Sequence, residues 1–141
     1  MQSGDDMKTV ASPLPCELAV RVVIPSLRAL VARELTQKYS MRQEEVASAL
    51  GVTQSAISQY VRNARGRTLN LEGIDPVHAI IENAAELIAT DRASTGQINL
   101  LYCKACRVVR ERKLLCEIHR KFDPIYHVEG CEACMPSSGG C

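Results

Sequence analysis

A chain of 141 residues, 46% of them hydrophobic, can bury one ordinary core and carry one small appendage. Its formal net charge of +1 argues against a non-specific nucleic-acid coat, which needs a broadly basic surface. No run of about 18 apolar residues occurs, and the N-terminus lacks the apolar core of a secretory signal. We therefore expect a cytoplasmic protein that does not span a membrane.

Helical patterns begin after a polar N-terminal segment. We expect residues 1–13 to be disordered, because they are rich in Gly, Asp and Ser and have little apolar content. From Pro15 onward, apolar residues repeat at three- and four-residue spacing. Pro25 cannot donate an interior helical hydrogen bond, so we expect it to end this helix and to open another that ends near Tyr39.

Residues 43–65 have the pattern of a DNA-binding helix-turn-helix. Ser40 is the expected N-cap of a short helix over about 42–50, and Gly51 is expected to make the turn because glycine tolerates a positive φ. Thr53 is expected to cap the second helix, which is the recognition helix of such motifs. Small or apolar residues stand where two crossed helices must touch, namely Val46, Ala47, Leu50, Val52, Ile57 and Tyr60.

The second helix of this pattern exposes a polar face. Amide and hydroxyl side chains can read base edges in the major groove, while helix ends and arginines contact phosphate. A solvated helix end is the alternative interpretation of the arginines, and a motif used only for protein binding is the alternative for the whole segment. The predicted base contacts are Gln54, Ser55, Ser58 and Gln59, and the predicted phosphate contacts are Gln43, Thr53, Arg62, Arg65 and Arg67.

Two further helices are expected beyond a linker. Pro76 suits the start of a helix with an apolar stripe over 77–88, and a second amphipathic helix is expected over 97–112, after a break at 94–96. The two stripes could form a dimer interface or the core of a monomer. Because one such DNA-binding domain covers only a half-site, a symmetric homodimer is the default expectation.

The cysteines are concentrated near the C-terminus: six of the seven lie in residues 103–141. Two CxxC pairs, each able to place two thiolates on one ion, flank a further cysteine among basic residues. Zinc could use Cys103, Cys106, Cys116 and His119, or both CxxC pairs, whereas an iron–sulfur cluster takes four thiolates with looser spacing. We expect Cys16 and Cys141 to lie outside the site. The candidate metal ligands are Cys103, Cys106, Cys116, Cys131 and Cys134.

Three stretches carry a more specific likeness: residues 15–60, the motif LYCKACRVVRERKLLCEIHRKF and the motif GCEAC. Over about residues 14–134 the chain resembles archaeal transcriptional regulators in which an XRE- or phage-repressor-like helix-turn-helix precedes a cysteine motif predicted to hold an iron–sulfur cluster. The resemblance implies an iron–sulfur cluster without specifying which four of the five clustered cysteines bind it; we expect a [4Fe–4S] cluster, with Cys103 as the alternate to one of a favoured set of ligands. It also implies that Gln43 braces Gln54 against adenine. The favoured set is Cys106, Cys116, Cys131 and Cys134.

We therefore expect an all-α protein with an N-terminal helical bundle containing the helix-turn-helix, then a helical dimerisation segment and a small cysteine-rich region. The expected divisions are a disordered N-terminus (1–13), a DNA-binding domain (14–68), a linker with an amphipathic helix (69–96) and a metal-binding region (97–141).

The expected function is that of a DNA-operator-binding regulator whose affinity is modulated by the cluster through redox or iron sensing. One rival keeps the DNA binding and replaces the cluster with a structural zinc. A thiol-redox enzyme is disfavoured, because no βαβ pattern surrounds either CxxC and no acid–base dyad or nucleotide loop is present. A protein-interaction module without DNA readout is the third alternative. We therefore do not expect an enzyme.

Overall fold

The computed structural model describes residues 14–63, 66, 69–123 and 131, and the expected disordered segment 1–13 lies outside this part. Every regular element in the described part is a helix, which confirms the all-α expectation, and none of these helices is long and apolar enough to cross a membrane. In chain order they are α2 (Pro15–Leu18), the π-helical turn η1 (Ala19–Val23), α3 (Ile24–Gln37), α4 (Gln43–Leu50), α5 (Gln54–Val61), α6 (Asp75–Ala89), α7 (Thr95–Glu111) and α8 (Cys116–Phe122).

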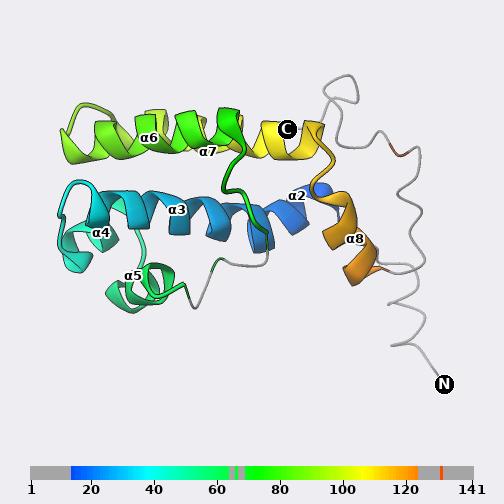
Figure 1. Ribbon diagram of the computed structural model, residues 1–141, viewed down its shortest axis with the longest axis horizontal. Coiled ribbons are helices and arrows are strands. Elements are labelled where there is room, and N and C mark those ends of the chain that lie inside the picture. Colours follow the sequence, from blue (N-terminus) through cyan, green and yellow to red (C-terminus); the bar gives the residue numbers. More distant parts are fainter. Residues whose placement is uncertain (1–13, 64–65, 67–68, 124–130, 132–141) are drawn as a thin grey trace.

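Helices α2, η1 and α3 form one continuous rod, so the expected break at Pro25 is wrong. The backbone N–H of Ile24 donates to the carbonyl of Ala19, five residues earlier, which makes this turn wider than an α-helical one. Pro25 follows directly, in the first turn of α3. A widened turn accommodates a proline ring that would otherwise collide with the preceding turn of a regular α-helix. The rod therefore runs on through the proline (Figure 1).

The α6–α7 pair packs across one side of α3 (Figure 1). Both predicted apolar stripes are buried here, and most of their residues join α3 in a single core. Of the two interpretations of these stripes, a dimer interface or a core within one chain, the structure shows the second for the buried faces. The buried residues are Val77, Ile81, Ala84 and Ala85 from α6, and Ile98, Ala105 and Val109 from α7.

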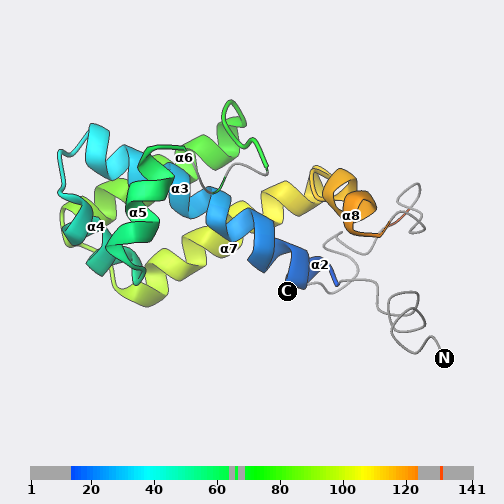
Figure 2. The ribbon, with the colours of Figure 1, turned by 90° about the horizontal axis from the view of Figure 1, so that it is seen from below.

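Helices α4 and α5 cover the other side of α3, near its C-terminal end (Figure 2). At the opposite end of the rod, α8 turns back from α7 and packs against α2, with the guanidinium carbon of Arg21 lying 5.8 Å from the centre of the Phe122 ring. The rod thus joins the α4–α5 unit at one end to α8, which carries Cys116, at the other.

Helix α7 begins two residues earlier than expected. The Ser94 hydroxyl accepts a hydrogen bond from the backbone N–H of Gln97 at 3.3 Å, and the Gln97 side chain accepts one from the backbone N–H of Ser94 at 2.8 Å. This reciprocal capping box satisfies two donors at the helix start and fixes the first residue at Thr95. The predicted break at 94–96 is therefore a helix cap followed by the first turn.

Candidate nucleic-acid interface

The α4–turn–α5 unit is built by short-range contacts. Gly51 ends α4 in the left-handed conformation with φ 66°, as predicted, and the next backbone N–H, that of Val52, donates to the carbonyl of Ala47 at 3.0 Å. The Thr53 hydroxyl then accepts a hydrogen bond from the backbone N–H of Ala56 at 3.0 Å and so caps α5. These contacts fix the direction in which α5 leaves the turn.

The cap of α4 differs from the prediction. Arg42, not Ser40, precedes the helix, and its backbone N–H donates to the Glu45 carboxylate at 2.8 Å. Ser40 instead adopts φ 53°, two residues upstream in the connection. A serine before a helical pattern is a common cap signal, but Ser40 lies two residues before the position that caps α4. Glu45 takes over the helix start because it can reach back three residues.

Burial determines which face of α5 is outward. Ala56, Ile57 and Tyr60 are buried in the core shared with α3 and α4, with exposed fractions between 0% and 5%. The opposite face follows the helical repeat over 54–55, 58–59 and 62, and it is entirely polar. Figure 1 shows α5 on the side of α3 away from the α6–α7 pair. The polar face of α5 therefore points out of the molecule.

The structure brings most of the predicted DNA contacts onto or beside this polar face. Gln54, Ser55 and Arg62 are exposed, and Ser58 and Gln59 are half-buried. Thr53 is exposed at the start of α5, and Gln43 is half-buried at the start of α4. Arg65 and Arg67 lie outside the described residues. The site roles given to all these residues remain predictions.

The predicted brace between two glutamines is not formed in the protein alone. Gln43 and Gln54 are both described, and the structure has no hydrogen bond between their side chains. Each stands at the first position of its helix, as the resemblance implies. The pairing therefore remains a prediction for the DNA complex.

The two arginines near the interface differ in whether a carboxylate offsets their charge. Arg42 lies 3.3 Å from the Glu44 carboxylate and 3.7 Å from that of Glu45, so its charge is offset by two acids. Arg62 donates from Nε to the carbonyl of Ser58 at 3.3 Å and has no carboxylate partner among the described residues. The helix end at Arg62 is therefore the more favourable place for a phosphate.

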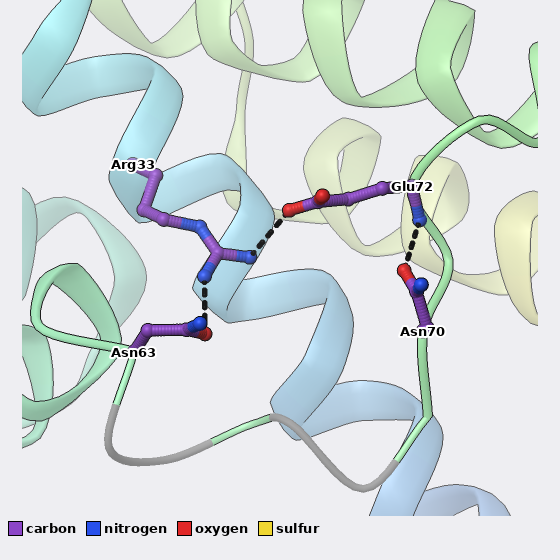
Figure 3. Close-up of polar contacts among 4 residues, drawn as sticks. All are labelled: Arg33, Asn63, Asn70 and Glu72. Atoms are coloured by element: carbon purple, nitrogen blue, oxygen red, sulfur yellow. Dashed lines mark hydrogen bonds and ion pairs between the residues drawn. The ribbon is translucent and has the colours of Figure 1, made fainter.

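A polar clamp that sequence reasoning missed holds the end of α5. Arg33 of α3 donates to the Asn63 side-chain oxygen at 2.7 Å and lies 3.5 Å from the Glu72 carboxylate (Figure 3). The Asn70 side chain in turn accepts from the backbone N–H of Glu72 at 3.1 Å (Figure 3). The clamp fastens the C-terminal end of α5 and the segment before α6 to the same arginine. These contacts span 30 and 39 residues, so no local sequence pattern signals them.

Gly66 lies in the connection between α5 and α6, where its backbone approaches α3. It has φ 74°, and a Cβ placed there would lie 2.7 Å from the Pro25 carbonyl oxygen and 2.8 Å from the Ala29 Cβ. Real Cβ atoms do not tolerate such contacts, so only glycine fits without a shift of the backbone. This close approach is a second restraint on how the recognition unit joins the rod.

The predicted metal ligands are spread along the second half of the chain. Cys103 is exposed on α7, Cys106 is half-buried one turn further along α7, and Cys116 is half-buried at the start of α8. Cys131 is also half-buried, and Cys134 lies outside the described residues. Within the described part, no three His, Cys, Asp or Glu residues are grouped closely enough to hold a metal ion. The predicted ligand set therefore remains a prediction.

Comparison with known protein families matches residues 32–72 to a family model described as "Helix-turn-helix". This segment is a helix-turn-helix. The match begins within α3 and ends just before α6, so it includes α4, the turn at Gly51 and α5. It supports an XRE-like DNA-binding domain of a transcriptional regulator. Comparison with curated proteins and with solved structures gave no match.

Proposed function

We propose that this protein is a sequence-specific DNA-binding transcriptional regulator whose affinity for its operator is modulated by a cysteine-ligated iron–sulfur cluster. The observation that carries the DNA-binding part is the outward polar face of α5 within a segment that matches a helix-turn-helix. A recognition helix of this kind enters the major groove, where short polar side chains meet base edges.

The residues of the interface divide into two roles. Gln54, Ser55, Ser58 and Gln59 would face the bases, because they occupy the outward side of α5. Thr53 and Gln43, at the starts of α5 and α4, would meet phosphate, where backbone N–H groups also point outward. Arg62, and Arg65 beyond it, would anchor the other end of the helix on the backbone of the DNA.

The regulator would act as a homodimer on double-stranded DNA. One recognition helix covers a half-site, and two copies related by a two-fold axis read half-sites about 10 base pairs apart. The buried faces of α6 and α7 pack within the chain, so a second copy would have to bind a surface that remains exposed. One such surface is the outer side of α7 around Leu100, which is 63% exposed. Light scattering of the purified protein would test the dimer: a mass of one chain at micromolar concentration would contradict it.

The cysteines supply donor chemistry suited to an iron–sulfur cluster, but the described residues do not assemble a site. Thiolates are the ligands of such clusters, and Cys106 and Cys116 lie on consecutive helices joined by a short turn. A complete ligand set would need Cys134 as well as Cys131 to approach them. A bound cluster would supply a redox-sensitive cross-link among these cysteines.

The rod offers a physical path between α8, which carries Cys116, and the helix-turn-helix. Helix α8 packs against α2 at one end of the rod, and α5 packs against α3 at the other. Ordering or loosening of residues 103–134 would therefore act on the element that carries the recognition helix. Since both half-sites must be met at once, a small change in the orientation of α5 relative to its dimer mate would weaken binding.

Selection from a pool of random DNA duplexes would test sequence-specific binding by the full chain. We expect one motif with two related halves to be enriched, because each α5 would read one half-site. Recovery of DNA with no shared motif, at an affinity governed only by salt, would contradict sequence-specific readout.

Anaerobic purification followed by iron, sulfide and zinc analysis would test the cluster. We expect a brown protein with stoichiometric iron and sulfide, and we expect Cys116→Ser to lose both. Cys16→Ser is the matched control, since Cys16 is exposed on α2, away from the cysteine motif in the sequence, and should keep the metal. A colourless protein with bound zinc would support the structural-zinc alternative and contradict the cluster.

A further inference from the structure

A cavity of about 350 Å³ lies where the helix-turn-helix meets the α6–α7 hairpin. The end of α4 and the turn after it form one side, through Ser48 and Gly51. The other side is the hairpin, through Asp91, Asn99 and Tyr102. A volume of this size falls at the lower end of the range for small-molecule sites.

Arg28 of α3 also lines this cavity and brings a positive charge to it. Its side chain is half-buried, and it has no ion pair or hydrogen bond with any residue that the structure describes. A guanidinium fork that lines a cavity suits a planar oxyanion, which accepts two parallel hydrogen bonds. The cavity therefore contains a cation that forms no ion pair with any described carboxylate.

Tyr102 adds a second donor beside Arg28. Its hydroxyl is buried and has no hydrogen-bond partner among the described residues. Burial raises the pKa of Tyr102 to about 12, with the nearby Arg28 charge acting in the opposite direction, so the hydroxyl stays protonated and can donate. A buried hydroxyl without a partner is destabilising, so an incoming acceptor gains free energy by pairing with it. Because the hydroxyl oxygen is buried, a ligand oxygen can reach it only if neighbouring side chains move.

The remaining walls indicate the rest of the ligand. Leu50, Leu87 and Ile98 present apolar surface to the cavity, which suits a hydrocarbon body. Asp91, exposed at the hairpin turn, places a negative charge on the same cavity. One carboxylate paired with Arg28 is compatible with that charge, whereas a ligand carrying several negative charges would be repelled.

We infer that this cavity binds a small monocarboxylic acid with an apolar body, held by Arg28 and Tyr102. Ser48 and Gly51 belong to the helix-turn-helix, and Gly51 makes the turn directly before the recognition helix. A bound acid therefore joins that turn to the α6–α7 hairpin. Any resulting change in DNA affinity rests on the proposed function, whereas the binding of the acid does not.

Titration of the ¹⁵N-labelled full chain with phenylacetate and with 4-methylpentanoate, in the absence of DNA, tests the site. We expect saturable shifts of the Gly51 and Asn99 amides with a Kd of about 1 mM or lower, as for a small fragment with one charged contact. Phenylacetamide and 4-methylpentanamide keep the shapes and lack the charge, and they should bind at least about tenfold more weakly. Equal binding of acids and amides, or no saturable shift by about 10 mM, would overturn the inference.

Substitutions locate the binding. Arg28→Gln and Tyr102→Phe should each weaken phenylacetate binding, the former by about tenfold or more because it removes a charged contact. Arg112→Gln is the matched control, because Arg112 is exposed at the far end of α7. Amide spectra that keep the native dispersion show that a variant still folds. Undiminished affinity in the folded Arg28→Gln variant would place the acid elsewhere and overturn the assignment.

The DNA measurement is kept separate. Operator affinity without acid tests the proposed function, and the shift in that affinity on saturation with phenylacetate tests the coupling. A protein that binds the acid but no specific DNA would contradict the proposed function and leave the acid site intact. A protein that binds its operator but neither acid would contradict the acid site and leave the proposed function intact.

Discussion

The helix-turn-helix and α8, which carries Cys116, lie at opposite ends of the α2–α3 rod, and they differ in how they are held. Around α5, buried side chains and helix caps lie within a few residues of one another, and the Arg33 clamp adds restraint from α3. Around α8, a seven-residue helix packs on α2, and the candidate ligands are separated along the chain. The first unit is a preformed binding surface, whereas the second would need a ligand to bring its donors together.

The difference in packing can be tested with two isoleucines. Ile57 of α5 is fully buried in the main core, and Ile118 of α8 is 4% exposed but lies outside that core cluster. Ile57→Ala should lower the free energy of unfolding by about 2–5 kcal/mol. Ile118→Ala should lower it less, because α8 can open locally without unfolding the bundle. Urea denaturation followed by circular dichroism measures both, and equal losses would remove the distinction between the two regions.

Substitution of two glycines in the connection after α5 distinguishes the cost of backbone strain from the cost of close packing. Gly66 and Gly73 both have positive φ, but only Gly66 lies against other atoms, with nothing within 4 Å of a Cβ at Gly73. Gly73→Ala should cost about 1–2 kcal/mol through the left-handed conformation alone. Gly66→Ala should cost about 1–3 kcal/mol more, because its methyl group meets the Pro25 carbonyl and Ala29. Thermal unfolding of the two variants gives the comparison, and a cost at Gly66 no greater than that at Gly73 would contradict the close approach to α3.

Removal of one predicted base contact should weaken operator binding without affecting the fold. Gln59→Ala should cost about 1–3 kcal/mol of binding to the selected operator, because an amide that can pair with a base edge is lost. Asn83→Ala is the matched control, since Asn83 is an exposed amide on α6, a helix on the side of α3 opposite α5. Fluorescence anisotropy titrations measure both affinities. Equal losses for the two variants would place the reading face away from α5.

The smallest expected effect is on the salt dependence of DNA binding. Arg62→Ala should weaken binding to all sequences alike and reduce the slope of log K against log salt by about one unit, because one phosphate contact is lost. Arg112→Ala, at the end of α7, should leave the slope unchanged. A change in base preference at one operator position would show instead that Arg62 reads a base.

The sequence predicted best those elements whose ends are set by neighbouring residues. Gly51, Thr53 and Pro76 each act on adjacent backbone, so the turn and the start of α5 were found at the right places and the start of α6 to within one residue. Pro25 was misread because the wider turn that accepts it leaves no pattern in the residue order. Ser40 was misread because a cap depends on the backbone path between the cap and its helix.

The long-range parts of the site could not be predicted. Arg33 meets Asn63 and Glu72 only after α3, α5 and the segment before α6 have packed together. Likewise, the cavity lined by Arg28 and Tyr102 joins parts of α3 and α7 that are far apart in sequence. The cysteine spacing predicts metal binding, but ligation requires a three-dimensional grouping that spacing alone does not establish.

The most direct test of the account is a paired selection from random DNA with the wild-type chain and with Gln54→Ala. Gln54 is exposed at the first position of α5, where it would read one base pair of each half-site. We predict that the variant enriches the same two-part motif with the base preference lost at one position in each half. An unchanged motif with the same preference at every position would contradict base readout by Gln54 at the start of α5.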